Sequence, residues 1–357
     1  MDGSKGQPKI TAGLDLGDRY SYLCLIDTKS GEVIEESRLR TTPEALRRRF
    51  RSERPLRVAI EAGTHSPWVS RLLEECAHEV LVANPRKVRL IYSNKRKTDE
   101  IDAENLARLA RLDPKLLYPL KHRSEDSQAH MALIRSRQAL VDCRTQLVNH
   151  VRGAVKSFGH RLPKCPARSF HKRAAEHIPE ALRPALELIL EQIGSLTEHI
   201  RQYDRKLETV CEEHYPETEL LRQVEGIGPL TALTFVFTLE DPYRFEKSRT
   251  VGAYLGLVPA RDHSGDRDPQ KHISKEGNEM LRKLLVSSAH YILGPFGSDS
   301  DLRRHGEKIA SRGAKNAKKR AVVAVARKLA VLLYSLWISG EVYEPLRNTH
   351  RSGAQAA

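Results

Sequence analysis

The chain has 357 residues, which suggests two or three domains at roughly 100–200 residues per domain. Lys and Arg number 60 against 46 Asp and Glu, so the formal net charge is +14, and 39% of the residues are hydrophobic. This apolar content excludes a wholly disordered chain. The positive charge favours a polyanionic partner, and nucleic acid leads because its phosphates release counterions when Lys and Arg bind.

Five cysteines lie far apart, with no Cys-x-x-Cys pair. This spacing argues against a structural zinc site or a disulfide framework and favours a reducing compartment. The first residues, MDGSKGQPKI, lack the apolar stretch of a secretory signal, and we expect no apolar run to reach the ~18–20 residues that span a bilayer. We therefore expect a cytoplasmic protein without membrane contact.

The first part of the chain predicts alternating strands and helices. Lys9–Leu16 and Ser21–Asp27 are apolar-rich runs around a short turn and predict a hairpin. Glu32–Arg40 predicts a third strand, and Thr42 is placed to cap a helix after it. A strand at Arg57–Glu61, a helix at Pro67–Ala77, a strand at Glu79–Ala83 and a further helix follow. This order is that of a ribonuclease-H-like α/β fold, which we expect over residues 8–120.

The middle, residues 125–213, predicts two long helices. Apolar pairs recur every seven residues between Leu133 and Val155. The second helix has apolar residues in alternating steps of four and three from Leu182 to Val210, a heptad seam that favours left-handed helix pairing. The seam fits an intramolecular hairpin or a coiled coil between two protomers, and the two can coexist.

The last third, residues 216–345, predicts a mainly α-helical domain, and residues 346–357 a disordered tail. Helices are expected at Gln270–Ile292 and Ala314–Ile338. Gly226 and Gly228 lie in a Gly-x-Gly turn between two apolar segments. Such a turn resembles a helix-hairpin-helix element, whose N–H groups hold phosphate without reading sequence, although a simple helix–helix turn is the alternative.

Four carboxylates are candidates for a metal site. Asp15 ends the first strand, Glu61 ends the fourth, and Asp99 and Asp102 open the helix after the fifth. Neighbouring strand ends would bring them together, and clustered carboxylates repel each other unless a hard cation such as Mg²⁺ lies between them. Two Mg²⁺ ions about 3.5–4 Å apart could then act on a phosphodiester.

Basic segments lie beside this site and in the last third of the chain. A run from Arg86 to Lys97 contains no acid and ends in Lys95, Arg96 and Lys97 just before the carboxylates. Lys318, Lys319 and Arg320 lie near the start of a predicted helix whose later residues form an apolar stripe. We interpret both segments as contacts to a nucleic-acid backbone.

Ser264 lies in a charged loop, where a simple turn is the ordinary interpretation. No Gly-x-Ser-x-Gly elbow is present, so an α/β-hydrolase serine is not indicated. A serine that attacks phosphorus needs nearby cations to stabilise the developing charge. The residues around the loop supply such cations: Arg261, His263, Lys271, His272, Lys275 and Arg282.

Together these residues resemble the DEDD transposases of the insertion-sequence-110 type, which are related to the Piv invertases and understood as RNA-guided recombinases. The resemblance covers nearly the whole chain. It rests on GLDLG, AIEAGTHSPW, KTDEIDAENLARL, VEGIGPLTA, GLVPARDHSG and HISKEGNEMLRKLL.

The resemblance implies a RuvC-like nuclease domain, a coiled-coil insertion and a C-terminal transposase domain. It assigns the metal-binding carboxylates to Asp15, Glu61, Asp99 and Asp102, and the catalytic serine to Ser264 ahead of Ser274. It also implies DNA and a non-coding guide RNA as partners, and a dimer, or a tetramer on DNA, whose active site joins carboxylates and serine of different protomers. We expect such a protein near a bacterial nucleoid.

Two other functions remain open from the sequence. A structure-specific RuvC-like junction endonuclease would use the four carboxylates but not Ser264. A non-catalytic nucleic-acid scaffold would need neither. A covalent protein–DNA adduct would distinguish the transposase from both.

Overall fold

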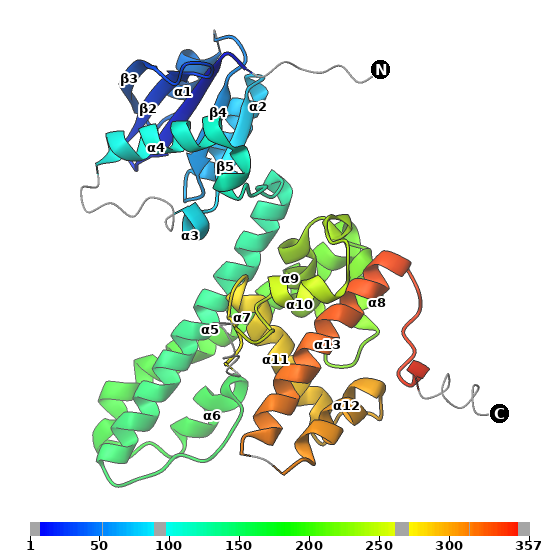
Figure 1. The fold of residues 1–357 in the computed structure, drawn as a ribbon. Helices are drawn as coiled ribbons and strands as arrows, with labels where there is room; N and C mark the ends of the chain where they lie inside the picture. Colours follow the sequence, from blue (N-terminus) through cyan, green and yellow to red (C-terminus); the bar gives the residue numbers. More distant parts are fainter. Residues whose placement is uncertain (1–7, 52, 89–97, 261–270, 314, 349–357) are drawn as a thin grey trace, which may run out of the picture. The chain divides into compact units, whose positions relative to one another are not determined.

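The computed structural model describes residues 8–51, 53–88, 98–260, 271–313 and 315–348 (Figure 1). The chain divides into two compact units, Met1–Ser124 and Glu125–Ala357. The first is a mixed α/β unit and the second is helical, which confirms the predicted fold class at this level.

The first unit is built on one five-stranded sheet. Its strands are β1 (Ile10–Leu16), β2 (Tyr20–Asp27), β3 (Val33–Arg40), β4 (Arg57–Glu61) and β5 (Glu79–Ala83). They lie in the order β3-β2-β1-β4-β5, with β1 antiparallel to β2 and parallel to β4. Every strand predicted from the sequence is present, with its ends within one residue of the prediction.

Helices cover both faces of this sheet. On one face, α1 (Pro43–Phe50) and α2 (Ser66–Glu75) pack Phe50 and Leu73 against alternate strand residues such as Leu14 and Ile60. On the other face lies α4 (Asp99–Leu112), whose alanines contact the intervening strand residues. Thr42 caps α1 as predicted, since its hydroxyl accepts a hydrogen bond from the Ala45 N–H at 3.3 Å. A short α3 (Pro85–Val88), which the sequence did not predict, separates β5 from α4.

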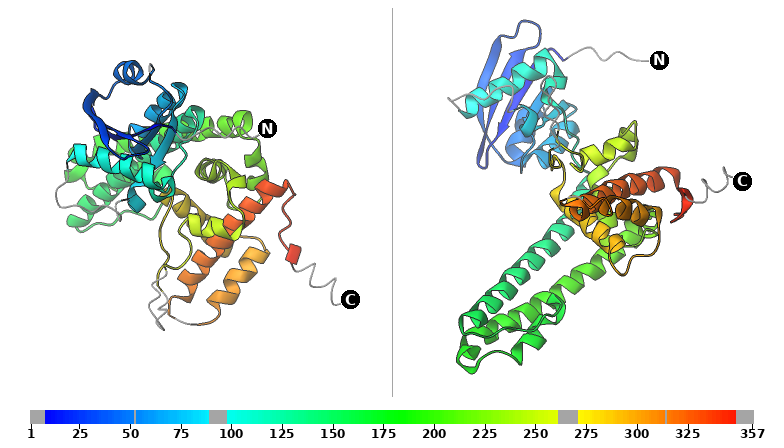
Figure 2. Two further views of the ribbon diagram at one scale, coloured as in Figure 1. Left: turned by 45° about the horizontal axis from the view of Figure 1, so that its top comes forward. Right: turned by 60° about the horizontal axis from the view of Figure 1, so that its bottom comes forward.

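The second unit opens with a long antiparallel helix pair. It consists of α5 (Glu125–Ser157) and α7 (Arg183–His214), with the short α6 (Phe170–Ala175) packed between their far ends (Figures 1 and 2). Contacts pair early residues of one helix with late residues of the other: Arg137 bonds Asp204, and Arg144 bonds Thr197. The apolar seam predicted on α7 is largely buried within the helical hairpin, and Ile193 is fully inaccessible to solvent. The intramolecular hairpin therefore accounts for the seam without a second protomer.

The rest of this unit is a helical bundle. It contains α8 (Glu217–Arg222), α9 (Pro229–Leu239), α10 (Arg249–Tyr254), α11 (Glu279–Leu293), α12 (Asp301–Ala310) and α13 (Ala317–Ser339). The core joins α9, α11 and α13 through side chains such as Phe235, Leu285 and Leu329. The apolar stripe predicted after residue 320 is thus part of the core.

Two expectations for this unit are wrong in detail. α11 begins at Glu279 rather than Gln270, because residues 271–278 are irregular and Ile273 pairs with Pro259. The tail does not start at residue 346: the backbone N–H of Asn348 donates to Asp301 at 2.8 Å, which ties 345–348 to α12. Residues 349–357 lie outside the described part of the chain.

An apolar run long enough to cross a membrane does exist, contrary to expectation. In the described part of the chain, α13 alone has that length and composition, with a mean hydropathy of 1.8 over its best window. Half of that window is buried, and Val325, Leu329 and Leu333 belong to the core. Packing inside the bundle accounts for the run.

Candidate active site

Asp15 and Glu61 lie side by side at the carboxyl ends of two neighbouring inner strands, β1 and β4. We call this end of the sheet the carboxylate edge. Strands β1 and β4 are parallel and pair Leu14 with Ile60, so the next residues, Asp15 and Glu61, occupy adjacent positions. Alternation puts Asp15 on the same face as Gly13, and Glu61 on the same face as Ala59. Both side chains are half-buried. The two carboxylates therefore share the sheet face that α4 covers.

α4 runs antiparallel to β1, which brings its first turn to the same edge. At the far end of the helix, Arg111 donates to the carbonyl of Thr28, near the start of β1. In the middle, a Cβ on Gly13 would lie 1.9 Å from the Ala103 carbonyl oxygen and 2.6 Å from the Ala107 nitrogen. Only glycine permits this backbone contact. The beginning of α4 consequently lies toward Asp15 and Glu61.

Asp99 and Asp102 occupy this first turn, one helical turn apart. The Thr98 hydroxyl caps the helix by accepting from the Ile101 N–H at 3.4 Å, and the acids suit the positive end of the helix dipole. Asp99 is exposed and Asp102 half-buried. Asp15 and Glu61 thus lie at adjacent strand ends, and the turn of α4 that carries Asp99 and Asp102 lies toward the same end of the sheet.

The four carboxylates do not form a closed ligand set. Among the residues that the structure describes, no three His, Cys, Asp or Glu side chains are grouped closely enough to hold a metal ion. The donors nevertheless suit a hard divalent cation, because all four are carboxylates. The carboxylates therefore fit a divalent cation in the chemistry of their oxygen donors and in their position at the carboxylate edge.

His65 is a neighbour of this edge that the sequence reasoning did not single out. It lies in the turn after Glu61, where its Nδ1 accepts from the indole Nε1 of Trp68 at 3.1 Å. Its Nε2 therefore carries the proton in the neutral ring and faces Asp18 at 3.6 Å. The signal was present in the AIEAGTHSPW motif, which places His65 four residues beyond Glu61.

In the second unit, Ser264 lies outside the described residues, but the segments that hold its loop do not. The Ala260 N–H donates to His272 and the Ser274 N–H to Val258, both at 2.9 Å. Gly256 adopts a φ of +66°, and a Cβ there would lie 2.3 Å from the Glu276 nitrogen. The loop that carries Ser264 therefore leaves and re-enters the bundle through two paired segments.

Two other residues of this region were assigned roles that the geometry does not favour. Arg282 is 9% exposed, and its Nη1 donates to the carbonyls of Leu255 and Glu276 at 3.2 and 2.5 Å. Its buried guanidinium joins the end of α10 to the segment before α11 instead of contacting a phosphate. The hydroxyl of Ser274, the second choice of nucleophile, is buried and has no hydrogen-bond partner among the described residues.

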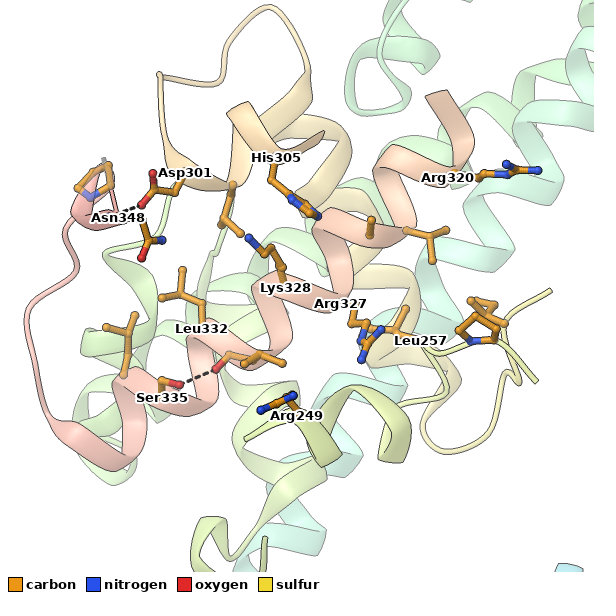
Figure 3. A pocket seen from close by; sticks show the side chains of 18 of the residues that line it. Arg249, Leu257, Asp301, His305, Arg320, Arg327, Lys328, Leu332, Ser335 and Asn348 are labelled. Carbon is orange, nitrogen blue, oxygen red and sulfur yellow. Dashed lines mark hydrogen bonds between the residues drawn. The ribbon is translucent and has the colours of Figure 1, made fainter. Parts of the chain in front are cut away.

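A basic groove of about 1440 Å³ lies along α13 and is also lined by Pro259 and Lys271 (Figure 3). Eight Lys or Arg side chains line it against two acids, Asp301 and Glu344. The cations come from α10, α13, the irregular segment before α11 and the C-terminal segment: Arg249, Lys271, Lys275, Lys319, Arg320, Arg327, Lys328 and Arg347. His305 of α12 faces Lys328 across the groove (Figure 3). Burial, with Lys328, Arg312 and Lys308 nearby, lowers the pKa of His305.

The first turn of α13 carries Lys318, Lys319 and Arg320, all exposed, and no acid. Cations at the positive end of a helix do not stabilise it. Lys319 and Arg320 line the groove, and Lys318 is exposed beside them. These side chains are thus better explained by an anionic ligand than by helix stability.

The remaining predicted contacts fall in two places. Gly226 adopts a φ of +83°, and its carbonyl accepts from the Ser288 hydroxyl at 2.8 Å, while Gly228 precedes α9. The turn is therefore fixed against α11. Lys95, Arg96 and Lys97 lie outside the described residues.

Comparison with known families identifies the family of this chain. A family model for the DEDD transposases of the IS110 type, described as a transposase, matches residues 12–159. A second, described as the transposase IS116/IS110/IS902 family, matches residues 218–295. The chain belongs to the IS110 family of transposases.

Curated relatives agree with this assignment along the chain. The transposase for insertion sequence element IS1328 of Yersinia enterocolitica is 30% identical over 343 residues, which are 94% of this chain and 99% of that protein. The transposase for insertion sequence element IS1111A of Coxiella burnetii is 30% identical over 260 residues, 71% of this chain and 70% of that protein. A probable family 20 transposase of Pseudomonas aeruginosa is 28% identical over 340 residues, 93% of this chain and 98% of that protein.

The two matched regions contain different groups of the predicted site residues. The first includes the four carboxylates and the second includes the Ser264 loop and the Gly226–Gly228 turn. All the basic residues on α13 lie beyond both regions, and sequence reasoning missed Arg249, Arg327 and Lys328 in the groove. Only the packing of α10 against α13 brings them together.

Proposed function

We propose that this IS110-family transposase excises and inserts an insertion-sequence DNA element, with Mg²⁺-bound carboxylates and Ser264 as the nucleophile. The observation that carries the proposal is the shared edge of the first unit, where Asp15 and Glu61 adjoin in register and the first turn of α4 approaches them. The strand order supports a RuvC-like, ribonuclease-H-like domain.

Asp15, Glu61, Asp99 and Asp102 would hold the metal, with two Mg²⁺ ions expected per site. Bound Mg²⁺ supplies positive charge for a scissile phosphate and for the oxygen that leaves it. The chain's own part is to keep four carboxylates at one edge, and the backbone contact between Gly13 and α4 does this. Their mutual repulsion favours a cation between them.

Ser264 would join its Oγ to the phosphorus of a DNA strand. The P–O bond to the departing strand breaks, the serine proton is lost to solvent, and the departing oxygen takes up a proton as a hydroxyl. A hydroxyl of another strand then attacks the same phosphorus, and the serine leaves with a proton. The ester keeps the bond energy, so that rejoining needs no nucleotide triphosphate.

The basic groove would hold the DNA backbone. Lys275, Lys319 and Arg320 line it, and Lys318 extends its charge. Phosphate contacts of this kind position a duplex without reading its sequence. Lys95, Arg96 and Lys97 remain proposed contacts, as do Gly226 and Gly228, whereas we no longer propose Arg282.

We also propose a guide RNA and a homo-oligomer, a dimer that forms a tetramer on DNA. These proposals rest on the family resemblance and on the net charge of +14, which suits a second polyanion. Sequencing of RNA that copurifies with the protein tests the first. Light scattering with and without DNA tests the second.

The decisive experiment is a search for the covalent adduct. Protein, copurified RNA, Mg²⁺ and end-labelled DNA are incubated and denatured, and label migrating with the protein is measured. We expect an adduct with the wild type and with Ser274→Ala, and none with Ser264→Ala. Adduct from Ser264→Ala but not from Ser274→Ala would make Ser274 the nucleophile. Recombination without any adduct would reject the serine mechanism.

The same assay separates the alternatives. A junction endonuclease would cleave without an adduct and lose activity in Asp102→Asn but not in Ser264→Ala. A non-catalytic scaffold would neither cleave nor respond to either substitution. Only the transposase requires both residues and leaves label on the protein.

A further inference from the structure

We propose that the far end of the α5–α6–α7 hairpin is a second nucleic-acid-binding site, which takes a single-stranded segment through its phosphates and one unstacked base. This surface, the hairpin tip, comprises residues 152–173. Figure 2 shows it at the end of the long helix pair, with α6 packed against α7. Most of it lies between the two regions matched by the family models, which end at residue 159 and resume at residue 218.

One of the basic segments of the chain that contain no acid lies here. Between Asp142 and Glu176 no acidic residue occurs, although Asp and Glu make up 46 of the 357 residues. The same segment contains three histidines and eight Lys or Arg residues: Arg144, Arg152, Lys156, Arg161, Lys164, Arg168, Lys172 and Arg173. The hairpin is therefore mixed in charge along its shaft and purely basic at its end.

Ion pairs follow the same division. At the start of α7, Arg183 pairs with Glu180. Farther along α7, Arg201 and Arg205 both pair with Glu198. In the described part of the chain, no carboxylate pairs with a cation of residues 152–173. All these cations except Arg152 are exposed. Unpaired charges of one sign attract an anionic ligand instead of stabilising the fold.

The tip contains a groove whose walls are held by hydrogen bonds and a ring contact. A groove of about 660 Å³ is lined by Arg152, Lys156, His160, Arg161 and Lys164, with no acid. Arg152 fixes one wall, since its Nη2 donates to the Pro163 carbonyl at 3.3 Å and its guanidinium lies 4.9 Å from the centre of the Phe170 ring. Phe170 is fully buried. The groove is thus a formed feature of the loop between α5 and α6.

The end of α5 holds the other wall. The His160 N–H donates to the Val155 carbonyl at 3.2 Å, and the Gly159 N–H to the Lys156 carbonyl at 3.0 Å. This pair of bonds is the Schellman ending of a helix. It orders the backbone between Lys156 and Arg161, so that their side chains flank one groove.

Phe158 indicates which nucleic acid fits. It is 52% exposed, and no other large hydrophobic side chain between 143 and 177 is exposed in the structure. An aromatic ring among cations is the combination that binds single strands, because a base stacks on the ring while the backbone follows the charge. Bases of a duplex are already stacked on one another. One exposed aromatic is too little apolar surface for a membrane, which needs an apolar face.

The first test removes charge. We compare Kd of the full chain for labelled oligo(dT) and oligo(rU) over a salt series, using Lys156→Ala/Arg161→Ala/Lys164→Ala. Three lost phosphate contacts should make the log–log salt slope shallower by about 2. Arg183→Ala/Arg201→Ala/Arg205→Ala is the matched control, because it removes the same charge from paired positions. Equal slopes for both variants would overturn the proposal. The oligonucleotide with the larger change identifies RNA or DNA as the ligand.

The second test removes the ring. Phe158→Ala should weaken single-strand binding at least about 5-fold, the effect of one lost base stack, and Phe158→Tyr should restore it. Duplex binding should not change. A duplex loss equal to the single-strand loss, or binding to phosphatidylserine vesicles that needs the tip while oligonucleotide binding does not, would reject the site.

A third measurement does not depend on any variant being folded. Ultraviolet crosslinking of thiouridine-containing oligo(rU), and of thiothymidine-containing oligo(dT), to the wild-type chain should label peptides that include Phe158. Crosslinks confined to peptides of the α13 groove would contradict the proposal. All three measurements report binding rather than strand transfer, so their outcome is independent of Ser264.

Discussion

The carboxylate edge and the basic groove of α13 are built in different ways. Asp15, Glu61 and Asp102 occupy regular positions on two strands and a helix, and backbone register sets where they lie. The cations of the groove come from exposed side chains of α10, α13 and irregular segments. The difference teaches that ligands for an ion need backbone precision, whereas contacts to a phosphate chain need charge density.

The comparison predicts different responses to substitution. Exchange of one carboxylate at the edge should remove an entire activity, because the other ligands cannot move to replace it. Exchange of one cation in the groove should weaken binding by a modest factor, because its neighbours remain.

The largest effect is expected for Asp102→Asn. Loss of this charge should lower strand cleavage by about 10³-fold, which corresponds to about 4 kcal/mol of transition-state stabilisation. Folding should be unaffected or slightly improved, because carboxylate repulsion falls. Cleavage rates and Tm measure the two effects.

Glu100→Gln is the matched control for Asp102→Asn. Glu100 is exposed in the same first turn of α4 and does not belong to the proposed ligand set. Equal cleavage by both variants would mean that the turn contributes only general negative charge.

The next effect is expected for Gly13→Ala. The added Cβ would meet backbone atoms of Ala103 and Ala107, which cannot rotate away, so α4 must shift from the sheet. We expect about 1–3 kcal/mol of destabilisation and a loss of cleavage in protein that is still folded. Urea unfolding and cleavage assays measure this. Gly63→Ala should change neither stability nor cleavage, since nothing lies within 4 Å of a Cβ there. Unchanged stability and cleavage in Gly13→Ala would show that the position of α4 does not depend on this contact.

Sequence reasoning predicted the edge well and the groove poorly, for physical reasons. Strand alternation and capping act over a few residues, so β1, β4 and the start of α4 could be predicted from local patterns, and the fold order then implied that Asp15 and Glu61 meet. The direct contact of Gly13 with Ala103 was not predicted, because it depends on the distance between a helix and a sheet.

The groove could not be predicted because it depends on which helix faces meet. Sequence shows that Arg249, Arg327 and Lys328 are charged but not that they share one hollow. Burial also distinguishes Arg282 from the groove cations. It is charged like Lys275, but its buried guanidinium donates hydrogen bonds to the carbonyls of Leu255 and Glu276. The sequence alone does not show which of the two residues is buried and which is exposed.

A smaller effect is expected for Lys319→Ala/Arg320→Ala/Arg327→Ala. Each lost phosphate contact should make the log–log salt slope of duplex binding shallower by about 0.9, without a preference for any sequence. Lys206→Ala/Arg201→Ala/Arg205→Ala on α7 removes the same charge away from the groove. Salt titrations of Kd on unrelated duplexes measure the slopes. If both variants change equally, net charge rather than the groove governs binding.

The smallest effect concerns two histidines whose pKa values are lowered for different reasons. Burial lowers the pKa of His78 in the first unit, where Leu56 N–H donates to Nδ1 at 3.1 Å and Nε2 donates to the Phe50 carbonyl at 3.0 Å. Burial also lowers the pKa of His305, but there the cations of the groove add to it. Only the second cause can be neutralised by a ligand.

We therefore expect a polyanion to raise the pKa of His305 and to leave that of His78 unchanged. Phosphates beside Lys328 offset its repulsion of the imidazolium, so the protonated ring becomes less costly. By linkage, the polyanion must then bind more tightly as the pH falls through the pKa of His305, and His305→Gln should reduce this pH dependence. NMR titration of the histidine Cε1–H signals, with and without duplex DNA, measures both rings in one sample. An equal rise at both histidines would indicate a general field of bound DNA, and no rise at His305 would mean that the duplex does not enter the groove.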